Sequence, residues 1–171
     1  MARAHAANLA RRSADYGVII GGEINVDMKR VKARKDIISG DASRAVEKWL
    51  KGTAGLSVFE GHARFESPTA VNVNNEVLEA AKIFINVGGR AMVPPLPGLD
   101  QVDYLTNSTM LGVDYLPAHL IIIGGSYIGL EFGQMYRRFG AKVTIIEKSK
   151  QIIGREDVDI SQGVLDILRK D

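Results

Sequence analysis

Residues 119–149 constrain the fold of this chain more than any other stretch. An apolar run at 120–123 leads directly into the glycine-rich turn GGSYIG at 124–129, and an amphipathic segment and a second apolar run at 143–146 follow before Glu147. This is the order of a βαβ dinucleotide-binding unit: strand, glycine turn, helix, strand, and an acidic residue about 20 residues further on. The pattern therefore predicts an α/β fold with a Rossmann-like βαβ unit over 119–171.

The turn departs from the G-x-G-x-x-G pattern at one position, because Ser126 stands where the second glycine belongs. Gly124 can make the tight turn out of the strand, since a residue without Cβ tolerates unusual dihedral angles. Gly129 allows close packing of helix and strand, and N–H groups at the helix start can bind a pyrophosphate. The expected nucleotide contacts are Gly124, Gly125, Ser126, Tyr127, Ile128 and Gly129. The alternative is a buried βαβ turn that binds nothing.

The helix after the turn has one apolar face. We expect Gly140 to end this helix, because glycine adopts the left-handed conformation of a helix C-terminus. The residues that form the face are Ile128, Phe132, Met135, Tyr136 and Phe139.

Glu147 indicates which nicotinamide nucleotide the unit would take. A carboxylate after the second strand can accept hydrogen bonds from the adenosine ribose and repels a 2′-phosphate, so it favours NAD over NADP. The neighbouring Lys148 weakens that distinction. A solvated acid at a strand end is the alternative interpretation.

Composition excludes several other functions. The chain has no cysteine, so thiol catalysis and thiolate metal sites within it are ruled out. No metal site is predicted, because His5, His62 and His119 lie far apart in the sequence. No apolar run reaches the ~20 residues that span a bilayer. The net charge of +2 gives no case for nucleic-acid or membrane binding, and the basic run at 29–35 is interpreted as a solvated helix face. A cytoplasmic protein is the default expectation.

The preceding part of the chain predicts helices followed by short strands. A helix is expected over 2–15 with Gly17 as its cap, and a second from an Asp27 N-cap to about Leu50. Strands are expected at 56–60, 63–65, 69–73, 77–78 and 83–86, with Asn74-Asn75 as a hairpin turn. The proline-rich segment 92–98 should be extended. A last helix is expected after 154–157, with Ile160, Val164, Ile167 and Leu168 on one face. The helix expected to begin after Asp27 should carry an apolar stripe of Val31, Ile38, Ala42, Ala45 and Trp49.

In order along the chain, these segments resemble the flavin-dependent pyridine nucleotide–disulfide oxidoreductases. Residues 3–12 are similar to the helix that follows the family's redox-cysteine segment, and 59–65 (FEGHARF) to its G-x-A segment. Residues 85–90 and 94–98 are similar to the segment that closes the FAD domain, with Val87 and Ala91 in place of its usual Thr and Pro. The resemblance implies FAD contacts at Ala63, Gly88 and Gly89. It divides the chain into part of an FAD-binding domain (1–91), a connection (92–118) and part of an NAD-binding domain (119–171).

The resemblance also implies two roles near the reacting groups. Tyr127 matches a tyrosine that covers the nicotinamide site, and Glu131 matches a glutamate that pairs with a lysine near the flavin. A helix-start aromatic residue that packs on the sheet and a partly exposed helix acid are the structural alternatives. No catalytic residue proper is assigned to this chain.

We therefore expect a fragment of a flavoprotein that passes hydride from NAD(P)H to FAD and on to a disulfide, metal or other acceptor. Both expected domains look incomplete, and the family's first glycine motif, cysteine pair and C-terminal dimerisation domain are absent from the sequence. The chain alone is expected to be inactive, and the parent protein to be a homodimer through the missing domain. The alternatives are a non-enzymatic NAD-binding or interaction module and an inactive truncated product. A serine hydrolase built on Ser126 is excluded, because G-x-S-x-G needs glycine where Ile128 stands.

Overall fold

A computed structural model describes residues 2–170, which form two compact units. One unit combines the chain up to Lys35 with the chain from Asp103 onward, and the other is Asp36–Val102. Among residues 2–170, no helix is both long enough and apolar enough to cross a membrane.

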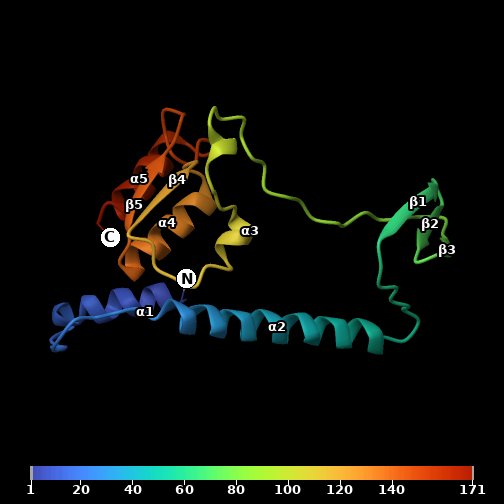
Figure 1. Ribbon diagram of the computed structural model, residues 1–171, viewed down its shortest axis with the longest axis horizontal. Helices are drawn as coiled ribbons and strands as arrows, with labels where there is room; N and C mark the ends of the chain where they lie inside the picture. Colours follow the sequence, from blue (N-terminus) through green and yellow to red (C-terminus); the bar gives the residue numbers. More distant parts are fainter. Residues whose placement is uncertain (1, 171) are drawn as a thin grey trace. The chain divides into compact units, whose positions relative to one another are not determined.

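The expected βαβ unit is present in the first of these units. Strand β4 (His119–Ile123) pairs in parallel with β5 (Lys142–Ile146), and helix α4 (Tyr127–Phe139) connects them (Figure 1). In this register Leu120 lies opposite Val143 and Ile123 lies opposite Ile146. Gly140 ends α4 with φ 119°, and its N–H donates to the carbonyl oxygens of Tyr136 and Arg137. The α/β prediction for residues 119–146 is confirmed.

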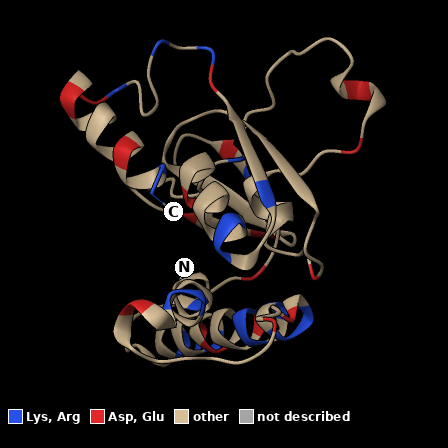
Figure 2. Cartoon of the chain, turned by 90° about the vertical axis from the view of Figure 1, so that its left-hand side faces the viewer, with Lys and Arg blue, Asp and Glu red and all other residues tan. Residues whose placement is uncertain are grey.

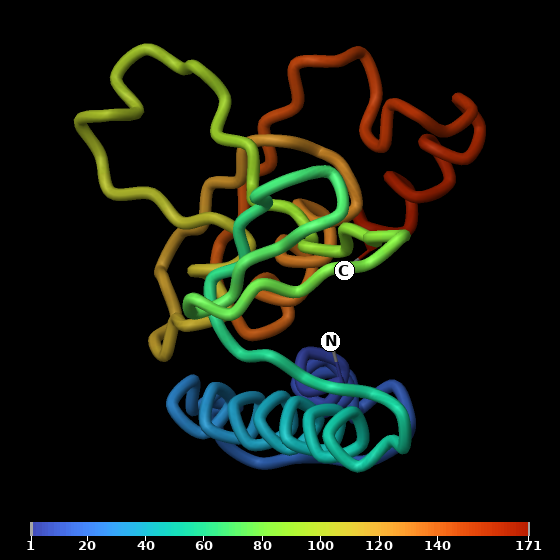
Figure 3. The backbone as a smooth tube through the Cα atoms, turned by 90° about the vertical axis from the view of Figure 1, so that its right-hand side faces the viewer, coloured from blue at the N-terminus to red at the C-terminus, as the bar shows by residue number. Residues whose placement is uncertain are grey.

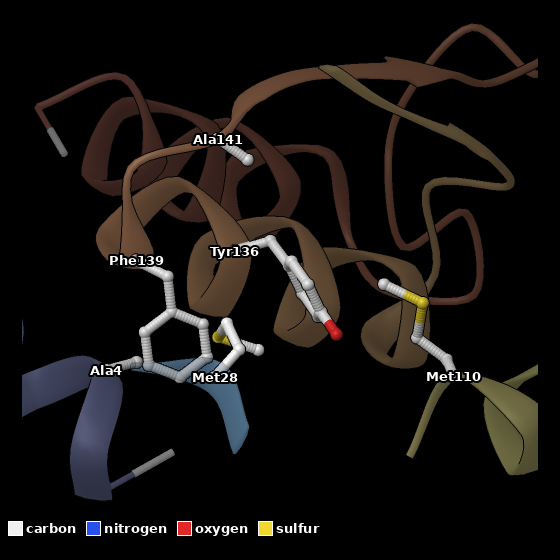
Figure 4. Close-up of a cluster of buried hydrophobic side chains, with 6 residues drawn as sticks. All are labelled: Ala4, Met28, Met110, Tyr136, Phe139 and Ala141. Carbon is white, nitrogen blue, oxygen red and sulfur yellow. The ribbon is translucent and has the colours of Figure 1, made fainter. Parts of the chain in front are cut away.

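Helix α4 packs against the strands and against α1 (Ala2–Arg11). In the core cluster the Phe139 side chain lies toward Ala4 and Met28, and Tyr136 extends toward Met110 (Figure 4). Tyr136 and Phe139 are each 2% exposed, as expected for the apolar face of α4. Ile128 differs from the prediction, since it is 38% exposed. It lies in the first turn of the helix, next to the glycine turn and away from this core.

The N-terminal helices form close to the predicted boundaries. Helix α1 is followed by a 3₁₀ helix (Ser13–Tyr16), and Gly17 ends it with φ 74°. Helix α2 (Met28–Gly52) appears as a long regular coil in Figure 3. Its N-cap is Asp27, whose Oδ1 accepts the Arg30 N–H at 3.0 Å. Beyond its basic first turns, Lys and Arg mix with Asp and Glu along α2 (Figure 2).

Two predicted apolar stripes are covered only in part. Val31, near the start of the α2 stripe, packs against the core cluster. On α2, Ile38 is 55% and Trp49 68% exposed. On α5 (Val158–Leu168), Ile160 is 50% and Ile167 63% exposed, whereas Val164 and Leu168 are half-buried. An apolar stripe is buried only where another element covers it, and the exposed positions of both stripes have no such cover within the described residues of their unit.

The β-meander matches the prediction in its centre. Strands β1 (Ala63–Ser67), β2 (Ala70–Val73) and β3 (Glu76–Glu79) form an antiparallel sheet in sequence order. Asn74 and Asn75 form the turn between β2 and β3 with φ of 53° and 70°, values that asparagine tolerates better than most residues. Ala70 and Val73 are its buried residues.

The strands predicted at 56–60 and 83–86 are wrong. Neither segment pairs with a strand, and Phe84 is 89% and Ile85 68% exposed. An apolar run becomes a strand only when a neighbour takes its backbone hydrogen bonds, and sequence periodicity does not report that neighbour. The proline-rich segment 92–98 lies outside helix and strand, as expected, before a short 3₁₀ helix (Leu99–Gln101) and helix α3 (Asn107–Met110).

Arg11 caps the C-terminus of α4 from α1. Its guanidinium donates to the carbonyl oxygens of Arg138 and Phe139, the latter at 2.9 Å. A cation at a helix C-terminus also interacts favourably with the helix dipole. We expect Arg11→Ala to lower the free energy of unfolding by about 1 kcal/mol, a value reduced for the exposure of Arg11. Urea unfolding measures this change in the free energy of unfolding. Arg11→Lys keeps the charge but not the forked geometry, so it should recover only part of the lost stability. Equal stability of all three chains would contradict the cap.

Candidate nucleotide-binding site

The glycine turn between β4 and α4 has a backbone conformation that favours glycine at its first position. Gly124 has φ 111°, in the region that L side chains rarely adopt. Its N–H donates to the Ile146 carbonyl oxygen at 2.8 Å, which extends the strand pairing by one residue. The turn therefore begins where the two strands end, at the carboxyl edge of the sheet. In open α/β sheets, ligands bind at this edge.

Two further glycines set how closely α4 approaches the strands. A Cβ on Gly129 would overlap the carbonyl oxygen of Gly124, and a Cβ on Gly133 would lie 2.9 Å from Cδ1 of Ile145. Gly129 meets a backbone atom, which cannot move aside as the end of a side chain can. The spacing of the two glycines places them on one face of the helix. Gly133 was not singled out from the sequence, although a second glycine one turn after Gly129 was a usable signal.

The N-terminus of α4 presents backbone donors at the glycine turn. Ser126 is the N-cap with φ −88° and ψ 175°, and its side chain makes no capping hydrogen bond. The first bond along the helix runs from the Leu130 N–H to the Ser126 carbonyl oxygen at 3.0 Å. The N–H groups of Tyr127, Ile128 and Gly129 precede it, so helix geometry gives them no intrahelical acceptor. Such donors, together with the helix dipole, favour an anion such as a pyrophosphate.

Glu147 follows β5 and holds the glycine turn. One carboxylate oxygen accepts the Gly125 N–H at 2.7 Å and the other accepts the Ser149 N–H at 2.8 Å. These backbone donors stabilise the charged form and lower the pKa of Glu147 to about 2. The carboxylate is therefore ionised at neutral pH and lies directly beside the turn. Gly125 is close enough that a Cβ there would lie 3.1 Å from Cβ of Glu147.

The segment after β5 also contacts the turn, through residues that sequence reasoning missed. The Ile153 N–H donates to the Gly125 carbonyl oxygen at 2.8 Å, and Ile153 has φ 42°. The Ser161 hydroxyl, on α5, donates to the Ile152 carbonyl oxygen at 2.8 Å. Ser161 is 3% exposed. No sequence pattern marks this arrangement, because it depends on a loop folding back onto the turn.

The remaining predicted site residues occupy both units. Tyr127 is 66% exposed, and Glu131, one turn further along α4, is exposed as well. Ala63 begins β1 opposite Val73. Gly88, with φ 68°, and Gly89 lie in the extended segment after β3, and a Cβ on either would meet no atom within 4 Å. The structure thus brings the glycine turn and Glu147 together, whereas the three residues expected to contact FAD belong to the unit Asp36–Val102.

A groove of about 790 Å³ lies at the other end of α4. It is lined by Arg11, Arg137, Phe139 and residues 19–20 and 22–26, among others. Because the glycine turn lies at the N-terminus of α4 and this groove at its C-terminus, the groove is separate from the candidate site.

Comparison with known proteins identifies relatives that are all oxidoreductases. The family described as pyridine nucleotide-disulphide oxidoreductase matches residues 8–171. A dihydrolipoyl dehydrogenase of Acholeplasma laidlawii is 33% identical over 168 residues, covering 96% of this chain and 50% of the relative. A mercuric reductase of Bacillus cereus is 32% identical over 143 residues, covering 82% of this chain and 22% of the relative.

A solved structure agrees with these sequence relatives. The HOCl-induced flavoprotein disulfide reductase RclA from Escherichia coli superposes with a TM-score of 0.76 at 36% identity, over 85% of this chain and 34% of that protein. The chain therefore spans half or less of the length of each relative named.

Proposed function

The chain belongs to the pyridine nucleotide-disulphide oxidoreductase family, and we propose on this premise that its glycine turn binds NADH. The whole protein would pass hydride from the nicotinamide to FAD and on to a disulfide, metal or other acceptor. NAD is preferred over NADP. This chain alone would not complete the reaction, and the whole protein would act as a homodimer.

The observation that carries the proposal is the position of the α4 N-terminus. Its donors at Tyr127–Gly129 lie beside the left-handed Gly124, and the ionised Glu147 lies at the end of the neighbouring strand. A pyrophosphate fits the backbone donors at the start of α4, and a ribose hydroxyl fits the carboxylate of Glu147. A 2′-phosphate would meet the negative charge of Glu147, which supports NAD over NADP.

The residues of this chain would bind and orient the cofactors. When both are bound, nicotinamide supplies the hydride and flavin accepts it. Tyr127 would cover the nicotinamide pocket, and Glu131, one turn away on the same helix face, would hold a charged partner near the flavin. Ala63, Gly88 and Gly89 would contact FAD. The chain contains no cysteine, so a disulfide step would use no residue of this chain.

Titration of the purified chain with NADH, followed by nicotinamide fluorescence, tests the proposal. We expect saturable binding of NADH, weaker binding of NADPH, and competition by NAD. A yellow preparation with the flavin absorption bands would show that the FAD contacts also function. Absence of saturable NADH binding by the chain would contradict the nucleotide site.

Ser126 offers a smaller test of the same site. Its φ of −88° and ψ of 175° are open to any residue, so the backbone does not require glycine here. Only the approach of the phosphate to Cβ is affected. We expect Ser126→Gly to tighten NADH binding by no more than ~1–2 kcal/mol. Isothermal titration measures the dissociation constant. Ser126→Val is the matched control with a bulkier side chain, and it should weaken NADH binding. If both variants bind NADH like the parent chain, Ser126 does not face the phosphate.

A further inference from the structure

Ser161 is the buried polar residue among 2–170, and the nucleotide motif does not account for it. It is 3% exposed, whereas the other buried residues of that part of the chain are glycine, aliphatic, Met or aromatic. Its hydroxyl donates to the carbonyl oxygen of Ile152 at 2.8 Å. A buried hydroxyl is costly unless it is hydrogen-bonded, and this bond ties Ile152 in the 150–153 segment to α5.

The next residue, Ile153, has an unfavourable backbone conformation. Its φ of 42° is left-handed, and a β-branched side chain is a genuine outlier there. Such a conformation persists only when its surroundings hold it. Two hydrogen bonds flank Ile153: the Ser161 bond to Ile152, and the bond from the Ile153 N–H to the Gly125 carbonyl oxygen at 2.8 Å.

Gly125 connects this segment to Glu147. Its carbonyl oxygen accepts from Ile153, and its N–H donates to the Glu147 carboxylate at 2.7 Å. A Cβ at Gly125 would lie 3.1 Å from both Cβ of Glu147 and Cγ2 of Ile152. The contacts therefore run without a gap from α5 through the loop to the turn and the strand-end acid.

We infer that Ser161 is a positioning residue for the adenosine end of the nucleotide site. By holding the Ile152 carbonyl, it keeps Ile153 left-handed and on Gly125, and Gly125 in turn keeps Glu147 beside the ribose position. This inference rests on the proposed NADH binding. Ser161 itself touches no ligand; it acts through Ile153 and Gly125.

The test compares NADH with reduced nicotinamide mononucleotide, which lacks the adenosine monophosphate half. We expect Ser161→Ala to weaken NADH binding about fivefold, the effect of one hydrogen bond, and to leave the affinity for reduced nicotinamide mononucleotide unchanged. Gly163→Ala is the matched control on α5, because a Cβ there meets no atom within 4 Å. Equal weakening for both ligands would overturn the inference, since it would indicate a general structural loss.

A second variant tests the role of the left-handed residue. Ile153→Gly removes the backbone strain, so the NADH penalty of Ser161→Ala should shrink in that background; an undiminished penalty would overturn the inference. Should Ser161→Ala fail to fold, Ser161→Cys replaces it, because its thiol is a weaker hydrogen-bond donor of similar shape. Ser161→Cys should bind NADH more weakly than the parent chain, and an unchanged affinity would overturn the inference. If the unaltered chain binds no NADH, the proposed function fails as well; if it binds NADH and Ser161→Ala does not change the affinity, only this inference fails.

Discussion

Gly129→Ala is expected to lower the free energy of unfolding by about 3 kcal/mol and to abolish measurable NADH binding. The added Cβ would overlap the carbonyl oxygen of Gly124 and lie 3.2 Å from Cγ2 of Ile122. Overpacking against backbone typically costs about 1–3 kcal/mol, and relief requires α4 to move away from β4. That movement displaces the N–H groups of the α4 N-terminus from the glycine turn. Chemical denaturation and NADH titration measure the two effects.

Gly163→Ala is the control for this substitution. Gly163 lies in α5, where an added Cβ meets no atom within 4 Å. Alanine is the better helix former by about 1 kcal/mol, so this variant should be as stable as the parent chain or more stable. If Gly129→Ala behaved like Gly163→Ala, the close approach of α4 to the turn would be wrong.

Glu147→Gln is expected to weaken NADH binding about tenfold and to leave NADPH binding nearly unchanged. The carboxylate accepts backbone N–H groups from Gly125 and Ser149, and an amide can replace only one of its two acceptor oxygens. The substitution also removes the charge that a 2′-phosphate would meet, which offsets the loss for NADPH. The ratio of the two dissociation constants is the measurement. An unchanged ratio would indicate that Glu147 only holds the turn.

The same residue has a predicted pH dependence. The pKa of Glu147 falls from 4.5 to about 2, chiefly through the hydrogen bonds from Gly125 and Ser149. A lowered pKa means that the folded state binds this proton less readily than the unfolded state, so the stabilisation is complete above about pH 4.5 and is lost as the pH falls toward 2. The difference in urea midpoint between the parent chain and Glu147→Gln should be constant from pH 5 to 8 and should shrink below. A constant difference down to pH 3 would contradict the assignment.

The βαβ unit could be predicted because its evidence is local. An apolar run, a glycine turn and an amphipathic segment each follow from the adjacent residues, and β4, α4 and β5 lie where these patterns place them. The hairpin at Asn74-Asn75 and the Asp27 cap are local in the same sense. The strands predicted at 56–60 and 83–86 failed for the opposite reason, since a strand depends on a partner that its own sequence does not specify.

The features of the candidate site also fall into local ones and ones that depend on tertiary packing. The sequence by itself determined the glycine turn, the strand-end acid and the family resemblance, because all three depend on residue type and spacing. Only the tertiary structure decided that Gly129 meets the backbone of Gly124, that Glu147 is already bonded to the turn, and that Ser161 and a left-handed Ile153 hold the loop against it. These contacts join residues that are separated by a helix, a strand or a loop. Their geometry is set by how the chain packs, which periodicity and motif spacing do not encode.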